Sequence, residues 1–358
     1  GSLALIKDAA SVPAIPDDLV IVGGEVEFAV GGSTRPQQIA RNADITIEEL
    51  GTLEGGGNAG QCDFGGIITI NGGAFRGSYG NGNHRFDYPG TGLRFNGGLF
   101  QSAAGTDSGT YRLLTDVSYA STSTKQALFR NAGDNMRLRL SEVAGTYTRT
   151  FDVADSSTLP ADTPEMQIDM RLQDDGTGVV TLRKTGDGTL ALTADNLYEG
   201  DTLVEDGMLQ ANNTAGSATS DGSVIVTNTG TLGGSGVVEG DVIVYSGASI
   251  NPGASLGTLT VSNNLEMVAG STLTVEMDAG GNDLLVVYGD LQIAGNVSPV
   301  LLDGYDPEPN TVWTIATVMD GGTLDITGAT ADPGYVVSAD ASNVYLSNPP
   351  QGTLFLVR

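Results

Sequence analysis

The sequence predicts an all-β protein built as a parallel β-solenoid, in which the chain winds in repeated coils of short strands. Three observations lead to this prediction. Short segments alternate apolar with polar side chains, as strands with one buried face do. The 52 glycines have no period of three, so they indicate turns and not a collagen helix. Strand and turn units also repeat along the chain, which is typical of solenoids.

The repeat is clearest in the C-terminal half. The segment GSVIV at 222–226 returns as GDVIV at 240–244, eighteen positions later, and a turn with a second strand pattern follows each copy. A period of this size fits one solenoid coil, with strands of adjacent coils about 4.8 Å apart. The N-terminal half has a looser echo in ITI at 45–47, ITING at 68–72 and LRFNG at 93–97. We therefore expect larger coils there and shorter, more regular coils in the C-terminal half.

Residues 102–175 follow the repeat less closely. The Ser- and Pro-containing stretch 155–164 favours a loop. We expect an irregular β segment near the middle, formed either by irregular coils or by an embedded sheet. Its strand patterns fall at 111–114, 127–130, 136–140, 147–153 and 166–172.

Composition limits the core and the partners. Aromatic residues are only 6% of the chain, so we expect a core of thin Val, Ile and Leu stacks, buried between neighbouring coils. The net charge of −27 argues against nucleic-acid binding, which needs clustered Lys and Arg. The only Trp, Trp313, is expected in the core or an end cap. Cys62 is the only cysteine, so no intrachain disulfide forms, and we expect it to be a buried apolar residue.

Charge is unevenly distributed along the chain. After Lys184 no Lys or Arg occurs until Arg358. Two interpretations stay open: two segments with different surfaces, or the acidic end of one subunit meeting the less acidic end of another. Several basic residues of the first half lie fairly close in sequence: Arg112, Lys125, Arg130, Arg137, Arg139 and Arg149.

Residues 182–211, LRKTGDGTLALTADNLYEGDTLVEDGMLQA, place three strand patterns and tight glycine turns in thirty positions. The KTGDGTL opening at 184–190, Asn196, the YEG triplet at 198–200 and the GMLQ close at 207–210 resemble the autotransporter-associated β-strand repeat. That repeat is found in secreted passenger regions of Gram-negative surface proteins. The resemblance implies a right-handed β-solenoid on the cell surface or outside the cell, and it implies no catalytic residues.

These patterns divide the chain into four parts. We predict an N-terminal tail strand and Pro link at 1–16, and an N-terminal solenoid with longer coils at 17–175. A passenger-like solenoid with an acidic surface follows at 176–348, and a C-terminal tail strand at 349–358. No apolar run is long enough for a membrane-spanning helix, so we expect no membrane insertion of this chain.

Both tails are short apolar strand candidates next to prolines. They can lie on the ends of their own solenoid, where they would cap open strand edges, or they can add to a neighbouring subunit. The candidate subunit-contact residues are Leu3, Leu5, Ile6, Leu354, Phe355, Leu356 and Val357.

Patterns for site chemistry are sparse. The string DAGGNDLL at 278–285 matches half of a calcium-binding repeat, but no second copy follows it. A turn between strands fits it better, and diffuse Ca²⁺ binding by the acidic half fits better than a specific site. We predict no catalytic residues, cofactor or metal site. Aspartates at turn positions are expected to hydrogen-bond their own backbone: Asp187, Asp195, Asp201, Asp206, Asp221 and Asp241.

Three functions compete on these observations. The first is a structural, non-enzymatic subunit of a cell-surface fibre or sheath, assembled head-to-tail as a homopolymer with exchange of terminal strands. The second is a monomeric adhesin or passenger domain that binds glycans or other cells. The third is a polysaccharide lyase or hydrolase, which would need clustered carboxylates.

Overall fold

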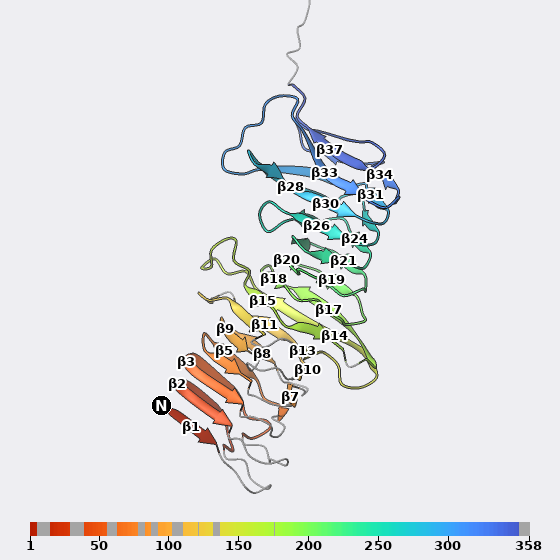
Figure 1. Cartoon of the computed structure of the whole chain (residues 1–358). Helices are drawn as coiled ribbons and strands as arrows, with labels where there is room; N and C mark the ends of the chain where they lie inside the picture. Colours follow the sequence, from red (N-terminus) through yellow and green to blue (C-terminus); the bar gives the residue numbers. More distant parts are fainter. Residues whose placement is uncertain are drawn as a thin grey trace, which may run out of the picture.

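The computed structural model describes residues 1–5, 15–28, 39–55, 63–77, 83–86, 92–101, 110–120, 122–131, 137–174 and 176–350. These residues form strands and turns and contain no helix. The strands stack into one elongated rod with β1 at one end and β37 at the other (Figure 1). The predicted all-β parallel β-solenoid is confirmed.

The first stack of parallel strands, column 1, runs the length of the molecule. It begins with the first halves of two long strands, β2 (Leu19–Phe28) and β3 (Ile45–Gly55). Then come β5 (Ile68–Asn71), β8 (Leu93–Phe95), β11 (Val117–Tyr119), β14 (Gly145–Val153), β17 (Gly178–Thr185), β19 (Thr202–Val204), β21 (Val224–Val226), β24 (Val242–Val244), β27 (Leu265–Met267), β31 (Leu291–Ile293) and β34 (Leu324–Asp325).

Column 2 runs beside it and is also parallel throughout. It contains β1 (Ser2–Leu5) and the second halves of β2 and β3. Then come β6 (Ala74–Arg76), β9 (Gly98–Gln101), β12 (Ala127–Arg130), β15 (Met166–Ile168), β18 (Thr189–Leu192), β20 (Met208–Ala211), β22 (Thr231–Gly234), β25 (Ser249–Pro252), β28 (Thr272–Asp278), β32 (Asn296–Leu301) and β35 (Thr330–Ala331).

Column 3 consists of two separate sheets. The N-terminal sheet contains β4 (Asp63–Phe64), β7 (Asn83–Phe86), β10 (Thr110–Leu113), β13 (Arg137–Arg139) and β16 (Arg171–Gln173). The C-terminal sheet contains β23 (Val237–Val238), β26 (Thr258–Val261), β30 (Leu284–Val287) and β33 (Val312–Val318), all parallel. Two antiparallel strands, β37 (Asn343–Ser347) and β36 (Val336–Ala339), then end the molecule.

Burial follows the alternation that predicted the strands. In β28, for example, Leu273, Val275 and Met277 are buried and the residues between them are partly exposed. In β21, Val224 and Val226 face the interior. One continuous apolar core results, reaching from Ile21 to Leu346.

The core of the N-terminal half is aromatic, which corrects the expectation of thin aliphatic stacks. The rings of Phe75 and Phe100 lie 5.0 Å apart and almost parallel, and those of Phe100 and Phe129 lie 5.3 Å apart. These residues occupy equivalent positions on β6, β9 and β12, so each coil places one ring on the next. The expectation holds after β17, where Val, Leu and Ile dominate the buried positions.

Coil length varies along the whole molecule. Val224 pairs with Val242, which confirms the predicted eighteen-residue coil. Ile45 pairs with Ile68, 23 positions on. However, Leu291 pairs with Leu324, 33 positions on, so the prediction of shorter coils throughout the C-terminal half is wrong. The physical reason is that loops between the columns absorb the extra residues while the strands stay in register.

The middle segment consists of irregular coils and not an embedded sheet, since its strands continue the three columns. Residues 155–164 form a loop, as predicted. Between β16 and β23, where column 3 has no strand, Asn196 connects three coils. Its Oδ1 accepts the N–H of Leu172 at 2.8 Å and its Nδ2 donates to the carbonyl of Ala218 at 2.6 Å.

A row of side chains, the corner ladder, precedes the strands of column 1. In each case Oδ1 accepts a backbone N–H from the next coil, such as Asp201 from Ser223 at 3.1 Å and Asp290 from Thr323 at 2.7 Å. Asp201 and Asp241 therefore bond the neighbouring coil, which corrects the expectation that turn aspartates bond their own backbone. The ladder comprises Asp18, Asp44, Asp116, Asp201, Asp241, Asn264 and Asp290.

The C-terminal end is closed by the antiparallel strands. Trp313 on β33 is only 7% exposed and lies 6.4 Å from the ring of Tyr335. The predicted core or end-cap position of Trp313 is confirmed.

Candidate functional site

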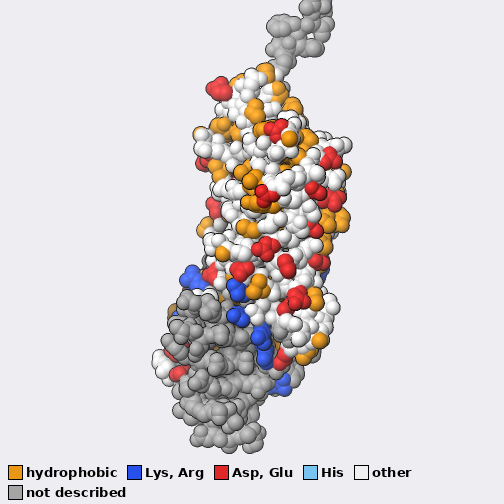
Figure 2. Space-filling view, turned by 45° about the vertical axis from the view of Figure 1, so that its right-hand side comes forward, with side chains coloured by type: hydrophobic (Ala, Val, Ile, Leu, Met, Phe, Trp, Pro, Cys, Tyr) orange, Lys and Arg blue, Asp and Glu red, His pale blue; other side chains and the backbone are white. Residues whose placement is uncertain are grey.

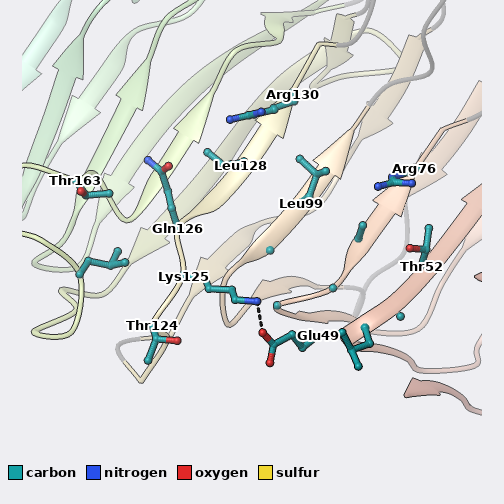
Figure 3. Close-up of a pocket in the computed structure, with 17 residues that line it drawn as sticks. Glu49, Thr52, Arg76, Leu99, Thr124, Lys125, Gln126, Leu128, Arg130 and Thr163 are labelled. Atoms are coloured by element: carbon teal, nitrogen blue, oxygen red, sulfur yellow. Dashed lines mark hydrogen bonds and ion pairs between the residues drawn. The ribbon is translucent and has the colours of Figure 1, made fainter. Parts of the chain in front are cut away.

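A groove of about 550 Å³ lies on column 2 in the N-terminal half. Strands β3, β6, β9 and β12 supply its floor, and the loop 155–164 contributes Leu159 and Thr163 to its wall. Figure 3 shows the labelled side chains over these strands. The groove is therefore shared by several coils and by a loop that the regular repeat does not contain.

Glycines on the groove floor allow adjacent coils to approach closely. A Cβ on Gly73 would lie 2.3 Å from the carbonyl oxygen of Glu48, and one on Gly98 would lie 2.6 Å from that of Gly73. Gly98 also has a φ of 112°, which favours glycine. Adjacent coils can thus stack closely, and no side chain fills the space above these positions.

Three cations line the groove. Arg76 and Arg130 end β6 and β12 and are exposed. They lie on either side of Leu99 in Figure 3. Lys125 forms an ion pair with Glu49 at 2.5 Å, and this contact lowers the pKa of the Glu49 carboxyl through its hydrogen bond and charge. Glu49 is thus paired with Lys125, and Arg76 and Arg130 are the other cations of the lining, with Glu54 opposite Arg76 on β3.

Apolar and polar side chains also line the groove. Leu99 and Leu128 are partly exposed on the floor, and Leu50 is 77% exposed at the rim. The polar side chains that line the groove are Thr52, Thr124, Gln126 and Thr163. A site that combines hydrogen-bond donors with apolar floor positions is suited to bind an amphipathic small molecule or chain.

A ladder of polar side chains runs along the neighbouring corner. Asn71 donates to Glu48 at 3.2 Å, Asn96 donates to Asn71 at 3.0 Å, and Thr122 donates to Asn96 at 3.3 Å. It borders a smaller, polar cavity of about 250 Å³. The Asn-Gly pairs at 71–72 and 96–97 lie at this corner, and the asparagine amides join successive coils.

The sequence contained one signal for the groove that was missed. Arg76 on β6 and Arg130 on β12 both pair with Gln101 on β9, so all three share one row. Aligning AFR at 74–76, LFQ at 99–101 and LFR at 128–130 would have placed the two arginines on one face.

Of the predicted subunit-contact residues, Leu3 and Leu5 lie on β1 at the N-terminal end of the molecule (Figure 1). Leu3 on β1 is 56% exposed, and Leu5 stands opposite Phe28 in the parallel pair β1–β2. The N-terminal tail thus lies on its own solenoid in this structure. The other predicted contact residues lie outside the described residues: Ile6, Leu354, Phe355, Leu356 and Val357.

The calcium-like string forms a turn, as favoured from the sequence. Asp278 Oδ1 accepts the N–H groups of Gly280 and Gly281 in a hairpin between β28 and β29 (Gly281–Asn282). Asp283 is buried and accepts the N–H groups of Gly257 and Glu276. Burial raises the pKa of Asp283 to about 6. Within the described ranges, no group of three His, Cys, Asp or Glu residues is placed to hold a metal ion.

The described part of the chain has no helix long and apolar enough to cross a membrane. Cys62 lies outside the described residues.

Comparisons with known proteins point to one class. The family model described as passenger-associated-transport-repeat matches residues 175–211. The extracellular serine protease of Serratia marcescens is 34% identical over 165 residues, which are 43% of this chain and 15% of that protein. The adhesin BmaC autotransporter of Brucella suis biovar 1 (strain 1330) is 36% identical over 129 residues, 34% of this chain and 4% of that protein. The chain thus spans only a small part of these relatives.

Proposed function

We propose that this chain, an autotransporter passenger-like β-solenoid at the cell surface or outside the cell, is an adhesin-like module that holds a glycan in the groove. The predicted resemblance to passengers and the predicted extracellular or surface location are confirmed by the repeat match and the relatives. A passenger or adhesin-like surface role follows from the same comparisons. The glycan and its site are our proposal.

The groove supports a glycan in its chemistry. Sugar rings offer apolar faces that fit partly exposed Leu99 and Leu128, and hydroxyl groups that accept from arginine and amide donors. Arg76 and Arg130 add a preference for a carboxylate-bearing sugar, because guanidinium groups bind carboxylates with two parallel hydrogen bonds. The matched repeat is non-catalytic, and the protease activity in the names of the Serratia relatives stays with those proteins. We propose no catalytic step.

Titration with a short uronic-acid oligosaccharide tests this function by calorimetry. We expect Arg76→Gln with Arg130→Gln to weaken binding at least tenfold, because both charge-assisted contacts are lost. The control is Arg94→Gln, an exposed arginine on β8 in column 1, which should change affinity less than twofold. Equal losses in both proteins, or no binding by the unmodified chain, would contradict the proposal.

We propose head-to-tail assembly as a second function, because apolar side chains are exposed at the N-terminal end. Leu3, Val20 and Val22 on β1 and β2 are each more than half exposed. An edge strand with apolar neighbours favours strand addition. The occupant we propose is the apolar segment GTLFLV at 352–357 of a second copy.

Deletion of residues 1–11 or 351–358 tests the assembly. Either deletion should abolish filaments seen by electron microscopy while the monomer keeps its far-UV circular dichroism. Leu3→Asp should do the same with a single change. Filaments that persist in both deletions would show that the tails do not join the subunits.

A further inference from the structure

Arginines stack in register on the N-terminal sheet of column 3. Arg85 on β7, Arg112 on β10 and Arg139 on β13 stand opposite one another, with Gln173 next on β16. A second row places Arg137 opposite Arg171. Neighbouring strands lie about 4.8 Å apart, so successive arginine positions recur at that spacing along the molecular axis. We call Arg112, Arg137, Arg139 and Arg171 the arginine face.

The protein compensates this charge only in part. Arg112 pairs with Glu142 at 3.0 Å, and Arg171 pairs with Asp195 at 2.8 Å. Arg137 and Arg139 form no ion pair within the described residues. The Nε atoms of Arg112 and Arg139 are buried and have no hydrogen-bond partner there. Like charges directly opposite each other destabilise a sheet, so this arrangement favours an external anion.

The arginine face is positively charged, whereas the molecule as a whole is acidic. The chain carries a net charge of −27. Figure 2 shows the blue Lys and Arg side chains grouped beside the grey region, and the red acidic side chains spread over the upper part of the visible face. A local positive face on an acidic molecule will concentrate anions at that place.

We infer that the arginine face binds a linear acidic polysaccharide that carries carboxylate or sulfate groups. A parallel sheet with a cation on successive strands fits an extended polymer with charges at regular intervals. Guanidinium groups form paired hydrogen bonds with both carboxylate and sulfate oxygens. An extracellular location brings the protein into contact with polysaccharides, which favours a polysaccharide over a nucleic acid as the occupant. This site is on column 3 and is separate from the column 2 groove.

Binding to polygalacturonate and to dextran sulfate, followed by biolayer interferometry against salt, tests the inference. We expect Arg137→Gln with Arg139→Gln to weaken binding of one polymer or both at least tenfold. Two lost contacts should also reduce the slope of log affinity against log salt by about 1 to 2, by analogy with phosphate contacts. The polymer that loses more affinity identifies the anion.

The matched control is the groove variant Arg76→Gln with Arg130→Gln, which changes net charge equally. It should alter dextran sulfate binding less than twofold, since the groove is assigned to uronic-acid sugars, and the arginine-face variant should in turn leave oligosaccharide binding in the groove unchanged. The experiment can therefore contradict one of the two proposed sites without contradicting the other. Equal effects of both variants on dextran sulfate binding would overturn the inference, because net charge alone would then explain binding. Tighter binding of duplex DNA, or loss of self-association in place of polymer binding, would overturn it as well.

Discussion

The two halves of the solenoid share one backbone plan and differ in what fills and covers it. Before β17 the core contains stacked Phe rings, and the surface carries the groove and the arginine face. After β17 the core is aliphatic, and no Lys or Arg follows Lys184 until Arg358. The same backbone plan therefore carries two different cores and two different surfaces, and the features to which we assign binding lie in the half with the aromatic core.

The coils beside the groove and the coils at the junction are joined by different side chains. In the N-terminal half a ladder from Glu48 to Thr122 borders the groove. At the junction Lys184 is fully buried, and its Nζ donates to the carbonyls of Thr185, Gly186 and Asp206 at 2.9, 2.6 and 3.0 Å. This lysine belongs to the passenger-associated-transport-repeat at residues 175–211. It connects two successive turns.

The largest effect should come from the aromatic stack. Phe100→Ala removes a ring between Phe75 and Phe129 and should cost about 4 kcal/mol. Because stacked coils contact only their neighbours, we expect the N-terminal half to unfold first. Urea unfolding followed by far-UV circular dichroism should then show an early transition, while the fluorescence of Trp313 keeps its midpoint.

The matched change in the other half is Leu232→Ala, a buried residue of β22. It should cost about 3 kcal/mol and lower the Trp313 midpoint instead. If both variants shift both signals equally, the halves unfold as one unit and the comparison fails.

A smaller effect is expected at the junction. Lys184→Met leaves three carbonyls without their donor and should cost about 2 kcal/mol at pH 7. Burial lowers the pKa of Lys184 to about 8. Between about pH 8 and the unfolded value of 10.5, the unfolded chain binds a proton that the folded chain has lost. Folding of the unmodified chain should therefore become more stable with rising pH in this window, relative to Lys184→Met.

Urea titrations of both proteins at pH 7, 9 and 10.5 measure that difference. A constant difference across the series would contradict the role of burial at Lys184.

The corner ladder should contribute less at each position. Asp201→Ala removes the acceptor of the Ser223 N–H and should cost about 1 kcal/mol in urea unfolding. Asp187→Ala is the control, since Asp187 is a turn aspartate outside the ladder, and it should change stability by less than about 0.5 kcal/mol. Similar costs for both would mean that the ladder bonds add nothing to ordinary turn formation.

The smallest effect should be at the groove surface. Lys125→Met breaks the exposed ion pair with Glu49, and exposed pairs add little to stability. We expect an unchanged midpoint in thermal unfolding. A clear loss of stability would mean that the groove residues support the fold, and would weaken their assignment to binding.

Much of the fold was predictable because strand alternation and glycine turns are local signals. The strand at 127–130 and the eighteen-residue step from Val224 to Val242 were predicted directly. The aromatic core was missed because a low overall content of aromatic residues hides their concentration in one half. The groove was missed because Arg76 and Arg130 are 54 positions apart and meet only through the register of β6, β9 and β12.

At the positions that it occupies, the corner ladder links the start of one coil to the next coil, whatever the length of the coil. Steps of 23 and 33 residues follow Asp241 and Asp290 in the same half of the molecule, yet both side chains make the same contact with the next coil. Alignment is thus specified by a few acceptors at one corner, independently of the loops. For protein engineering, this means that whole loops can be exchanged between coils, or foreign segments inserted, without redesign of the strands.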